Sequence, residues 1–430
     1  MTAKTRELGA LSIPSEPSAT VTFHTSAGYP PGSTHSIVEL KGQLRAGMLI
    51  TAPAKGSFQA QLEEVLGAQA AILGAQSQTM ELTSQTIFLR DPSTAAECEA
   101  QLEKLYGDRK PITSYVAQRP CTGAALALDA WGIGGPGIAI QRFGKNTISV
   151  AYDGIRWTHC GRVSPSSPVG PIYPRAMEAL GRMSEELVKA GTSFQNVVRT
   201  WFYLGGITDS EASTHRYQEL NRSRVDFYRN VHFFRSLLDP NAPRGVYPAS
   251  TGIGMQGDGL VMSCLALDTQ RHDLLLYPLE NPQQTPAYAY HPRYSTQSPK
   301  FSRAIALVTN DYVTTWISGT ASIVDSESRH PDDIEKQTEQ TIDNIERLIA
   351  EENFSFHGIH GTGVELKDFA KLRVYLKRES DMAKCKAICE RRFGAVPTVY
   401  ALAEICRPEL LVEIEGVAFS RYLGSKLVSR

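Results

Sequence analysis

The 430-residue sequence has no long hydrophobic run and no excess of charge of either sign. No segment approaches the ~20 consecutive apolar residues that span a bilayer, and the N-terminal stretch MTAKTRELGALSIPSEPS lacks the apolar core of a secretory signal. The 44 basic and 45 acidic residues give a net charge of -1, so no overall positive field attracts nucleic acid or anionic lipid. We therefore expect a cytoplasmic protein that binds neither nucleic acid nor membranes.

Patterns for disulfides, metals and nucleotides are missing as well. The seven cysteines are odd in number and scattered, which argues against a disulfide framework. Cys385 and Cys389 have the spacing of one helix face but no histidine nearby, and His357 and His360 lack further ligands at metal spacing. The stretches GIGGPG and GIGMQGDG match neither GxGxxG before a helix nor a loop ending in GKS or GKT. The sequence therefore predicts no metal and no cofactor.

The sequence does contain one pattern of elements repeated three times. Each copy opens with an extended stretch: SIVELKGQL, SVAYDGIRWTHCGRV or YVTTWISGTASIV. A long amphipathic helix follows in each: SFQAQLEEVLGAQAAIL, RAMEALGRMSEELVKAG or IEKQTEQTIDNIERLIAEE. In the third helix a stripe at helical spacing is formed by Ile334, Thr338, Ile342, Ile345, Leu348 and Ile349.

A β-rich strand, a second helix and a hairpin introduced by proline complete each copy. The order ββαβαββ predicts an α+β fold, with each unit a mixed β-sheet carrying two helices on one face. A glycine-rich join at 132–146 and a proline-rich join at 277–301 divide the chain into units 1–134, 135–285 and 286–430. Three similar units predict a pseudo-trimer with clefts between neighbours, as a monomer or as part of a higher homo-oligomer.

The closing strand of the third copy, in CRPELLVEIEGVA, carries Glu413 and Glu415. Residues two apart in a strand point to the same face. The matching strand of the first copy has only Asp129, and that of the second has its carboxylate late, at Asp268. We interpret the third copy as the only one with a carboxylate at the centre of the strand, which favours one functional site per chain. The alternative is a solvated sheet face, which is common in antiparallel sheets.

Arginines gather in the second copy. Arg222 and Arg224 lie in its second helix, Arg244 precedes its closing hairpin, and Arg303 follows in the third copy. Arginine is well suited to bind carboxylates through two parallel hydrogen bonds. Arg222 and Arg229 share a helix face and Arg224 points elsewhere. The alternative for each arginine is a solvated helix face.

Five other residues are candidates for binding or product choice. Tyr217 and Tyr247 offer hydroxyl groups, and the stretch ASTG offers Ser250 and Thr251 beside close backbone amides that suit a carboxylate. Tyr217 is equally compatible with helix packing, and ASTG with an ordinary strand start. Cys406 stands shortly before Glu413, and such a cysteine is usually a small core residue.

The repeated unit resembles the Rid family (reactive intermediate deaminases), whose chorismate mutase-like subunits form trimers with ligand sites between them. The second and third copies resemble the chorismatases, which remove the enolpyruvyl side chain of chorismate. The matching stretches are YQELNRSRVDFYR, YPASTGIGM, SPKFSRA, ISGTASIVDSESRH, QTEQTIDNIERL and ICRPELLVEIEGVA, within about residues 135 to 420. The first copy departs from the family, because we expect chorismatases to have fewer complete units.

The resemblance implies a cofactor-independent enzyme that converts chorismate to pyruvate and an aromatic or dihydroaromatic acid. It favours Glu413 as the general acid that protonates the enolpyruvyl methylene, with Glu415 raising the pKa of Glu413 or pairing with an arginine. It also implies that a cysteine at Cys406 accompanies hydroxybenzoate formation. We favour 3-hydroxybenzoate, with 4-hydroxybenzoate and the hydrolytic product, a dihydroxycyclohexadiene carboxylate, as alternatives.

Two other functions fit the repeats less well. A Rid-type deaminase of enamines or imines would carry an arginine just after the proline of the closing hairpin, but the three tripeptides read PCT, PAS and PTV. A non-catalytic binding or scaffold protein would have no need of Glu413 beside an arginine cluster in the adjoining unit.

Overall fold

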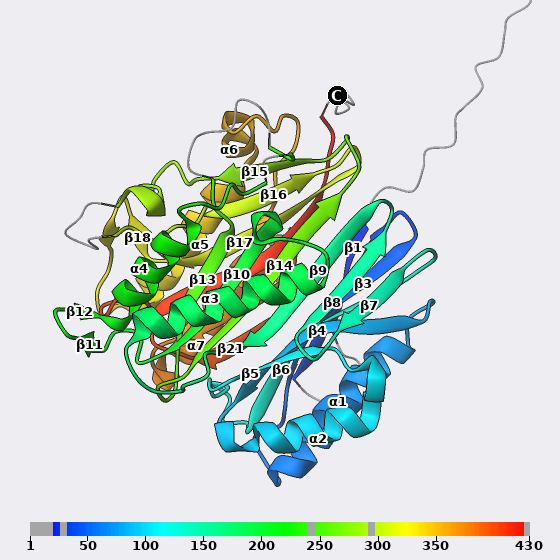
Figure 1. Ribbon diagram of the computed structural model, residues 1–430, viewed down its shortest axis with the longest axis horizontal. Coiled ribbons are helices and arrows are strands. Elements are labelled where there is room, and N and C mark those ends of the chain that lie inside the picture. Colours follow the sequence, from blue (N-terminus) through cyan, green and yellow to red (C-terminus); the bar gives the residue numbers. More distant parts are fainter. Residues whose placement is uncertain (1–19, 26–31, 235, 239–245, 291–296, 425–430) are drawn as a thin grey trace, which may run out of the picture.

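The computed structural model describes residues 20–25, 32–234, 236–238, 246–290 and 297–424 (Figure 1). Most of these residues lie in three six-stranded sheets and the helices that flank them. The first sheet contains, in spatial order, β1 (Thr20–Thr25), β2 (Ser33–Leu40), β3 (Gln43–Thr51), β6 (Leu126–Gly134), β4 (Met80–Leu89) and β5 (Ile112–Val116).

The other two sheets repeat this arrangement. The second contains β7 (Ala139–Phe143), β8 (Thr147–Tyr152), β9 (Ile155–Val163), β14 (Leu260–Thr269), β10 (Val197–Gly205) and β13 (Ala249–Met255). The third contains β15 (Leu275–Leu279), β16 (Ala304–Val308), β17 (Tyr312–Ala321), β22 (Val412–Arg421), β20 (Phe369–Leu376) and β21 (Thr398–Leu402). Two short hairpins, β11 (Ser210–Glu211) with β12 (Thr214–His215) and β18 (Ile323–Val324) with β19 (Glu327–Ser328), lie outside these sheets.

All three sheets have the same strand order and the same mixture of pairings. The two strands at one edge are parallel, β4 with β5, β10 with β13 and β20 with β21, and the other neighbours are antiparallel. In each sheet the strand that comes last in sequence, β6, β14 or β22, lies in the middle. The predicted mixed α+β fold is therefore confirmed. Strand β15 pairs with β16 in the third sheet, although the predicted second unit extends to residue 285.

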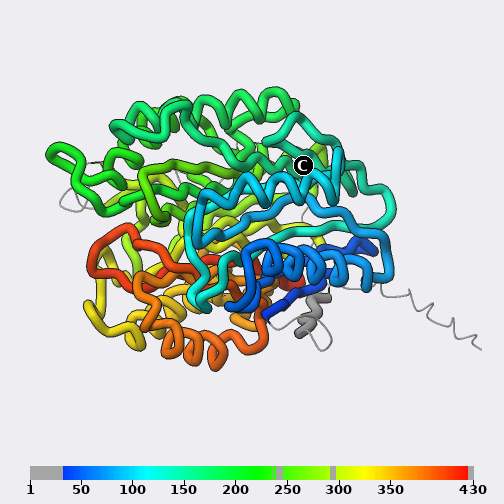
Figure 2. Tube along the Cα trace, turned by 90° about the horizontal axis from the view of Figure 1, so that it is seen from below, coloured from blue at the N-terminus to red at the C-terminus, as the bar shows by residue number. Residues whose placement is uncertain are grey.

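The helices are α1 (Phe58–Gly74), α2 (Ala95–Tyr106), α3 (Ile172–Lys189), α4 (Arg216–Tyr228), α5 (Ile334–Ile349), α6 (Glu351–Phe356) and α7 (Met382–Phe393). They lie at the periphery, with α1 and α2 on the first sheet, α3 and α4 on the second, and α5 and α7 on the third (Figures 1 and 2). None of the helices in the described ranges is long and apolar enough to cross a membrane.

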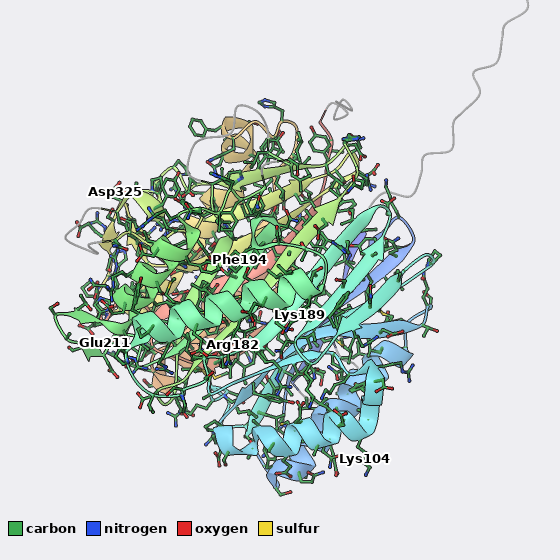
Figure 3. The ribbon with its side chains drawn as sticks, in the orientation of Figure 1. Lys104, Arg182, Lys189, Phe194, Glu211 and Asp325 are labelled. Carbon is green, nitrogen blue, oxygen red and sulfur yellow. The ribbon has the colours of Figure 1, made fainter. Side chains whose placement is uncertain are left out.

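Amphipathic sequence explains how these helices pack. On α3 the side chains of Met183 and Leu187 are buried, whereas Arg182 and Lys189 point outward (Figure 3). On α5 the whole predicted stripe is buried, and Asp333 caps the helix by accepting a hydrogen bond from the backbone amide of Lys336 at 3.0 Å. Each sheet thus has a helix-covered outer face, which leaves the opposite faces to meet inside the molecule.

Candidate active site

Glu413 and Glu415 lie on β22, in the middle of the third sheet and on the face turned away from its helices. Only 4% of Glu413 and 3% of Glu415 is exposed, so the alternative of a solvated sheet face is wrong. Burying two carboxyl groups is costly unless each is neutralised, hydrogen-bonded or protonated. Glu413 and Glu415 differ in their hydrogen-bond and ion-pair partners.

Strand register corrects one part of the sequence comparison. The middle strands β6, β14 and β22 each pair with a strand that contains a β-bulge: β4, β10 and β20. When the three middle strands are aligned at these bulges, Asp129 and Ser263 occupy the position of Glu415. Asp129 is buried, so the third copy is not the only one with a central carboxylate. The counterparts of Glu413 are Ala127 and Val261. The asymmetry among the copies therefore holds at Glu413 alone.

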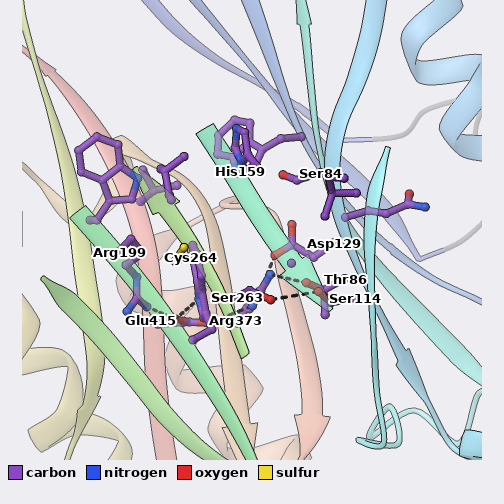
Figure 4. Close-up of a pocket in the computed structure, with 18 of the residues that line it drawn as sticks. Ser84, Thr86, Ser114, Asp129, His159, Arg199, Ser263, Cys264, Arg373 and Glu415 are labelled. Carbon is purple, nitrogen blue, oxygen red and sulfur yellow. Dashed lines mark hydrogen bonds and ion pairs between the residues drawn. The ribbon is translucent and has the colours of Figure 1, made fainter. Parts of the chain in front are cut away.

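Glu415 is fixed by an ion and hydrogen-bond network (Figure 4). Its carboxylate accepts hydrogen bonds from Arg199 and Thr251 of the second sheet and from the Tyr375 hydroxyl at 2.7 Å. Arg373 forms an ion pair with it at 3.3 Å. Burial acts to raise the pKa of Glu415, but Arg199 and Arg373 outweigh burial and hold that pKa below its ordinary value. Glu415 is therefore an anion with satisfied oxygens.

The same network reaches the first sheet through Asp129. Its carboxylate accepts hydrogen bonds from Lys371 and Arg373 of β20. Burial acts against the charge, yet Arg373 and Lys371 hold the pKa of Asp129 below its ordinary value. Charged side chains of all three sheets are thus joined where the inner faces meet.

Glu413 has no hydrogen bond or ion pair with any described residue and faces a pocket between the second and third sheets. Burial, together with the negative charge of Glu415, raises the pKa of Glu413 to about 8, although Arg199 and Arg303 act to lower it. At neutral pH the side chain is therefore mainly a protonated acid. Because no described residue hydrogen-bonds to this carboxyl group, its proton is available to a ligand in the pocket.

Two buried arginines line the same pocket. Arg224 on α4 donates to Asn221 at 2.9 Å and to the Ser250 hydroxyl at 3.2 Å. Arg303 donates to the backbone oxygen of Thr285 at 3.1 Å. Among the described residues neither arginine has a carboxylate partner, and the Nε atom of each is buried without any partner. Two buried arginines without an ion-paired carboxylate in one pocket suit a ligand with two carboxylates.

Three further predicted residues line this pocket: Tyr217, Ser250 and Cys406. Burial raises the pKa of the Tyr217 hydroxyl, so this group is neutral and donates hydrogen bonds. Burial also raises the pKa of Cys406 to about 12, with a smaller contribution from Glu413. Cys406 is therefore a neutral thiol in the pocket wall rather than a thiolate nucleophile.

The other predicted residues that the structure describes lie outside the pocket. Arg222 pairs with Glu219 at 2.6 Å on the outer face of α4, and 46% of its side chain is exposed. Tyr247 lies outside the pocket, in an aromatic cluster beside Tyr288. Thr251 turns toward Glu415, and Arg244 lies outside the described residues.

A β-bulge positions Glu413. The register of β17 against β22 shifts between Ile317 and Thr320, which places Gly319 directly against the carboxyl group. A Cβ atom at residue 319 would lie 1.9 Å from Oε1 of Glu413, and the backbone amide of Gly319 donates to Thr251 at 3.0 Å. Only glycine leaves room for Glu413 here, and the stretch ISGTA was the available sequence signal.

We expect Gly319→Ala to displace the Glu413 carboxyl group. Misplacing a reacting group by about 1 Å can lower turnover by roughly 10²-fold, so a loss of that order is expected while the protein remains folded. The measurement is turnover with the proposed substrate, alongside thermal unfolding. Gly67→Ala is the matched control, because a Cβ at Gly67 on α1 meets nothing within 4 Å. Normal turnover in Gly319→Ala would contradict the close fit.

Sequence reasoning missed several pocket residues, notably Asn221, Tyr290, Phe301, Gly319 and Arg407. It also missed Arg199 and Arg373, although a charged residue inside the apolar strands VVRTWFYL and KLRVYL was a usable signal. Within the described ranges, no group of three or more His, Cys, Asp or Glu side chains is placed to hold a metal ion.

The chain resembles characterised proteins over most of its length. It is 32% identical over 279 residues to a 3-hydroxybenzoate synthase from Streptomyces hygroscopicus, covering 64% of this chain and 76% of that protein. It is 32% identical over 285 residues to a chorismatase from Streptomyces rapamycinicus, covering 63% of this chain and 78% of that protein. No family model matches the sequence.

A solved structure agrees with these relatives on the fold. The crystal structure of a chorismatase superposes with a TM-score of 0.64 at 20% sequence identity, covering 88% of this chain and all of that one. The identity of 32% over more than three quarters of each of the two relatives, together with the shared fold, shows that the chain belongs to the chorismatase family.

Proposed function

We propose that this protein cleaves the enolpyruvyl ether of chorismate, releasing pyruvate and a hydroxybenzoate, with 3-hydroxybenzoate as the favoured product. One observation carries the proposal: Glu413 is a buried, protonated and unpartnered carboxyl group facing two arginines without carboxylate partners in the same pocket. Chorismate has two carboxylates and one acid-labile vinyl ether. The pocket offers a cation for each carboxylate and an acid for the ether.

In the proposed reaction Glu413 donates its proton to the methylene carbon of the enolpyruvyl group. The ether carbon becomes an oxocarbenium-like centre, which water or a neighbouring ring hydroxyl traps before pyruvate leaves. A general acid works best when its pKa lies near the working pH, and about 8 meets this condition. Arg224 and Arg303 would hold the substrate carboxylates, and Tyr217 and Ser250 would orient the ring.

The two product classes differ in their balance of atoms. Hydroxybenzoate and pyruvate together contain all the atoms of chorismate, whereas the dihydroxycyclohexadiene carboxylate route consumes one water. The neutral, apolar thiol of Cys406 in the pocket wall and the relative named as a 3-hydroxybenzoate synthase support the route without added water.

We also propose that the three sheets with their helices are three Rid-like units around a pseudo-threefold axis. The shared strand order and the matching bulges support this arrangement. The first of the predicted boundaries, between residues 134 and 135, is kept. The second, predicted between residues 285 and 286, is moved to before residue 275 because β15 belongs to the third sheet. Since Ala127 and Val261 replace Glu413 in the other units, each chain would have one competent cleft.

Incubating the purified protein with chorismate tests the function directly. We expect stoichiometric pyruvate and a hydroxybenzoate, identified against 3-hydroxybenzoate, 4-hydroxybenzoate and dihydroxycyclohexadiene carboxylate standards by chromatography. Unchanged chorismate with folded protein would refute the activity. Release of pyruvate together with the dihydroxycyclohexadiene carboxylate would be consistent with Glu413 as the general acid. It would show that the favoured product, 3-hydroxybenzoate, is wrong.

The pH dependence should follow the protonation of Glu413. The acid is active when protonated, so kcat/KM should be highest below a pH of about 8 and fall as the pH rises through that value. In Glu415→Gln the lost negative charge and the freed Arg199 both lower the pKa of Glu413, so the fall should begin at lower pH. A lower rate with an unshifted profile would show that Glu415 is only structural.

A further inference from the structure

The inner faces of the three sheets enclose a second cavity, separate from the Glu413 pocket. One part is lined by residues of all three sheets, among them Ser114, Asp129, His159, Arg199 and Arg373 (Figure 4). A neighbouring part lies toward Arg45, Tyr152 and Phe419. Both parts share the residues Trp131, His159, Leu265, Trp316 and Val417, so we treat them as one central cavity.

Aromatic side chains dominate its walls. The chain has only four tryptophans, and every one of them lines the central cavity: Trp131, Trp157, Trp201 and Trp316. No tryptophan lines the Glu413 pocket. The two parts of the cavity measure about 100 and 80 Å³, so only both together match the cavity of about 150 Å³ that holds a benzene ring. The space therefore suits a single aromatic ring.

The charges lining the cavity are not balanced. Four cations, Arg45, Arg199, Lys371 and Arg373, face two carboxylates, Asp129 and Glu415. Arg45 has no carboxylate partner among the described residues; it donates to the Tyr152 hydroxyl and lies 5.7 Å from the centre of the Phe419 ring. The guanidinium group of Arg45 is therefore a charged donor beside the cavity that no described carboxylate pairs with, and a guanidinium is well suited to bind a carboxylate.

Two further groups leave hydrogen-bonding capacity in the cavity. Lys371 donates to Asp129, and its ammonium lies 4.3 Å from the centre of the Trp131 ring. His159 has no hydrogen bond with any described residue. Burial lowers the pKa of His159 to about 4, so the ring is neutral and offers one donor and one acceptor.

We propose that the central cavity binds a small aromatic monocarboxylate, its ring among the indoles and its carboxylate near Arg45, Lys371 and His159. Aromatic walls and an excess of positive charge together select this class over neutral aromatics and over aliphatic acids. The probe is benzoate, which is not the proposed substrate. Because all four indoles surround this cavity, intrinsic tryptophan fluorescence reports its occupation.

The experiment titrates the full-length protein with benzoate. Acetate is the control that has the carboxylate but no ring, and benzyl alcohol is the control that has the ring but no charge. Benzoate should give a saturable change in fluorescence, and each control should bind at least about tenfold more weakly. Arg45→Gln should weaken benzoate binding at least about tenfold, while Arg222→Ala, a surface variant, should leave it unchanged. If Arg45→Gln does not fold, Leu265→Phe, which fills the cavity, should abolish the signal.

Three results would overturn the proposal. The first is a folded protein with no saturable benzoate signal. The second is benzyl alcohol binding as tightly as benzoate, which would remove the role of charge. The third is a benzoate signal that persists in Arg45→Gln and Leu265→Phe but disappears in Arg224→Ala, which would place the ligand in the Glu413 pocket.

Discussion

Glu413→Gln should lower chorismate turnover by ~10² to 10⁴, the usual contribution of a positioned general acid. Glutamine has the shape of glutamate and can hydrogen-bond, but it cannot donate the proton that starts the reaction. Because Glu413 makes no hydrogen bond or ion pair with described residues, the substitution breaks no contact there and the protein should fold normally. The measurement is pyruvate release in a single turnover, with chorismate binding measured separately.

Two controls sharpen this result. Glu409→Gln, an exposed glutamate that precedes β22, should keep normal turnover. Glu415→Gln should lose much less than Glu413→Gln, because Glu415 acts through the pKa of Glu413. Near-normal turnover in Glu413→Gln would refute the assignment, and an inactive Glu415→Gln beside an active Glu413→Gln would exchange the roles of the two residues.

Arg224→Ala should weaken chorismate binding by about 2 to 4 kcal/mol, the cost of leaving a buried anion without its cation. The pocket would then have lost the one arginine that α4 contributes to it. The measurement compares equilibrium binding of chorismate to Glu413→Gln and to the double variant Glu413→Gln/Arg224→Ala. The Glu413→Gln background prevents turnover during the measurement. Thermal unfolding checks that the loss does not reflect a misfolded α4.

The same helix provides the matched control. Arg222→Ala removes an identical side chain from the exposed face of α4, where it pairs with Glu219, and should leave binding unchanged. Arg224→Lys keeps the charge but loses the two-pronged geometry, so it should recover part of the affinity. Equal losses from Arg222→Ala and Arg224→Ala would show that the second sheet affects the pocket only through stability.

Sequence periodicity predicted the repeated elements because each helix and strand buries one face, as the stripe on α5 illustrates. It predicted Glu413 as a functional residue because a carboxyl group is uncommon in the middle of an apolar strand. It did not separate Arg222 from Arg224 as the pocket residue, since helix spacing says which residues share a face but not which face meets the third sheet. The hydrogen bond that Arg373 donates to Asp129 could not be predicted either, because it joins residues of different sheets.

The middle position of β6, β14 and β22 has a consequence for how the molecule assembles. Each of these strands comes last in its sheet's sequence and inserts between strands made much earlier, so no sheet can close on local contacts alone. Folding dominated by such distant pairings is slow. Because β22 also supplies Glu413 and Glu415, a partly assembled third sheet has no acid in the cleft. Recovery of pyruvate release after dilution from denaturant would therefore report the pairing of β22 with β17 and β20.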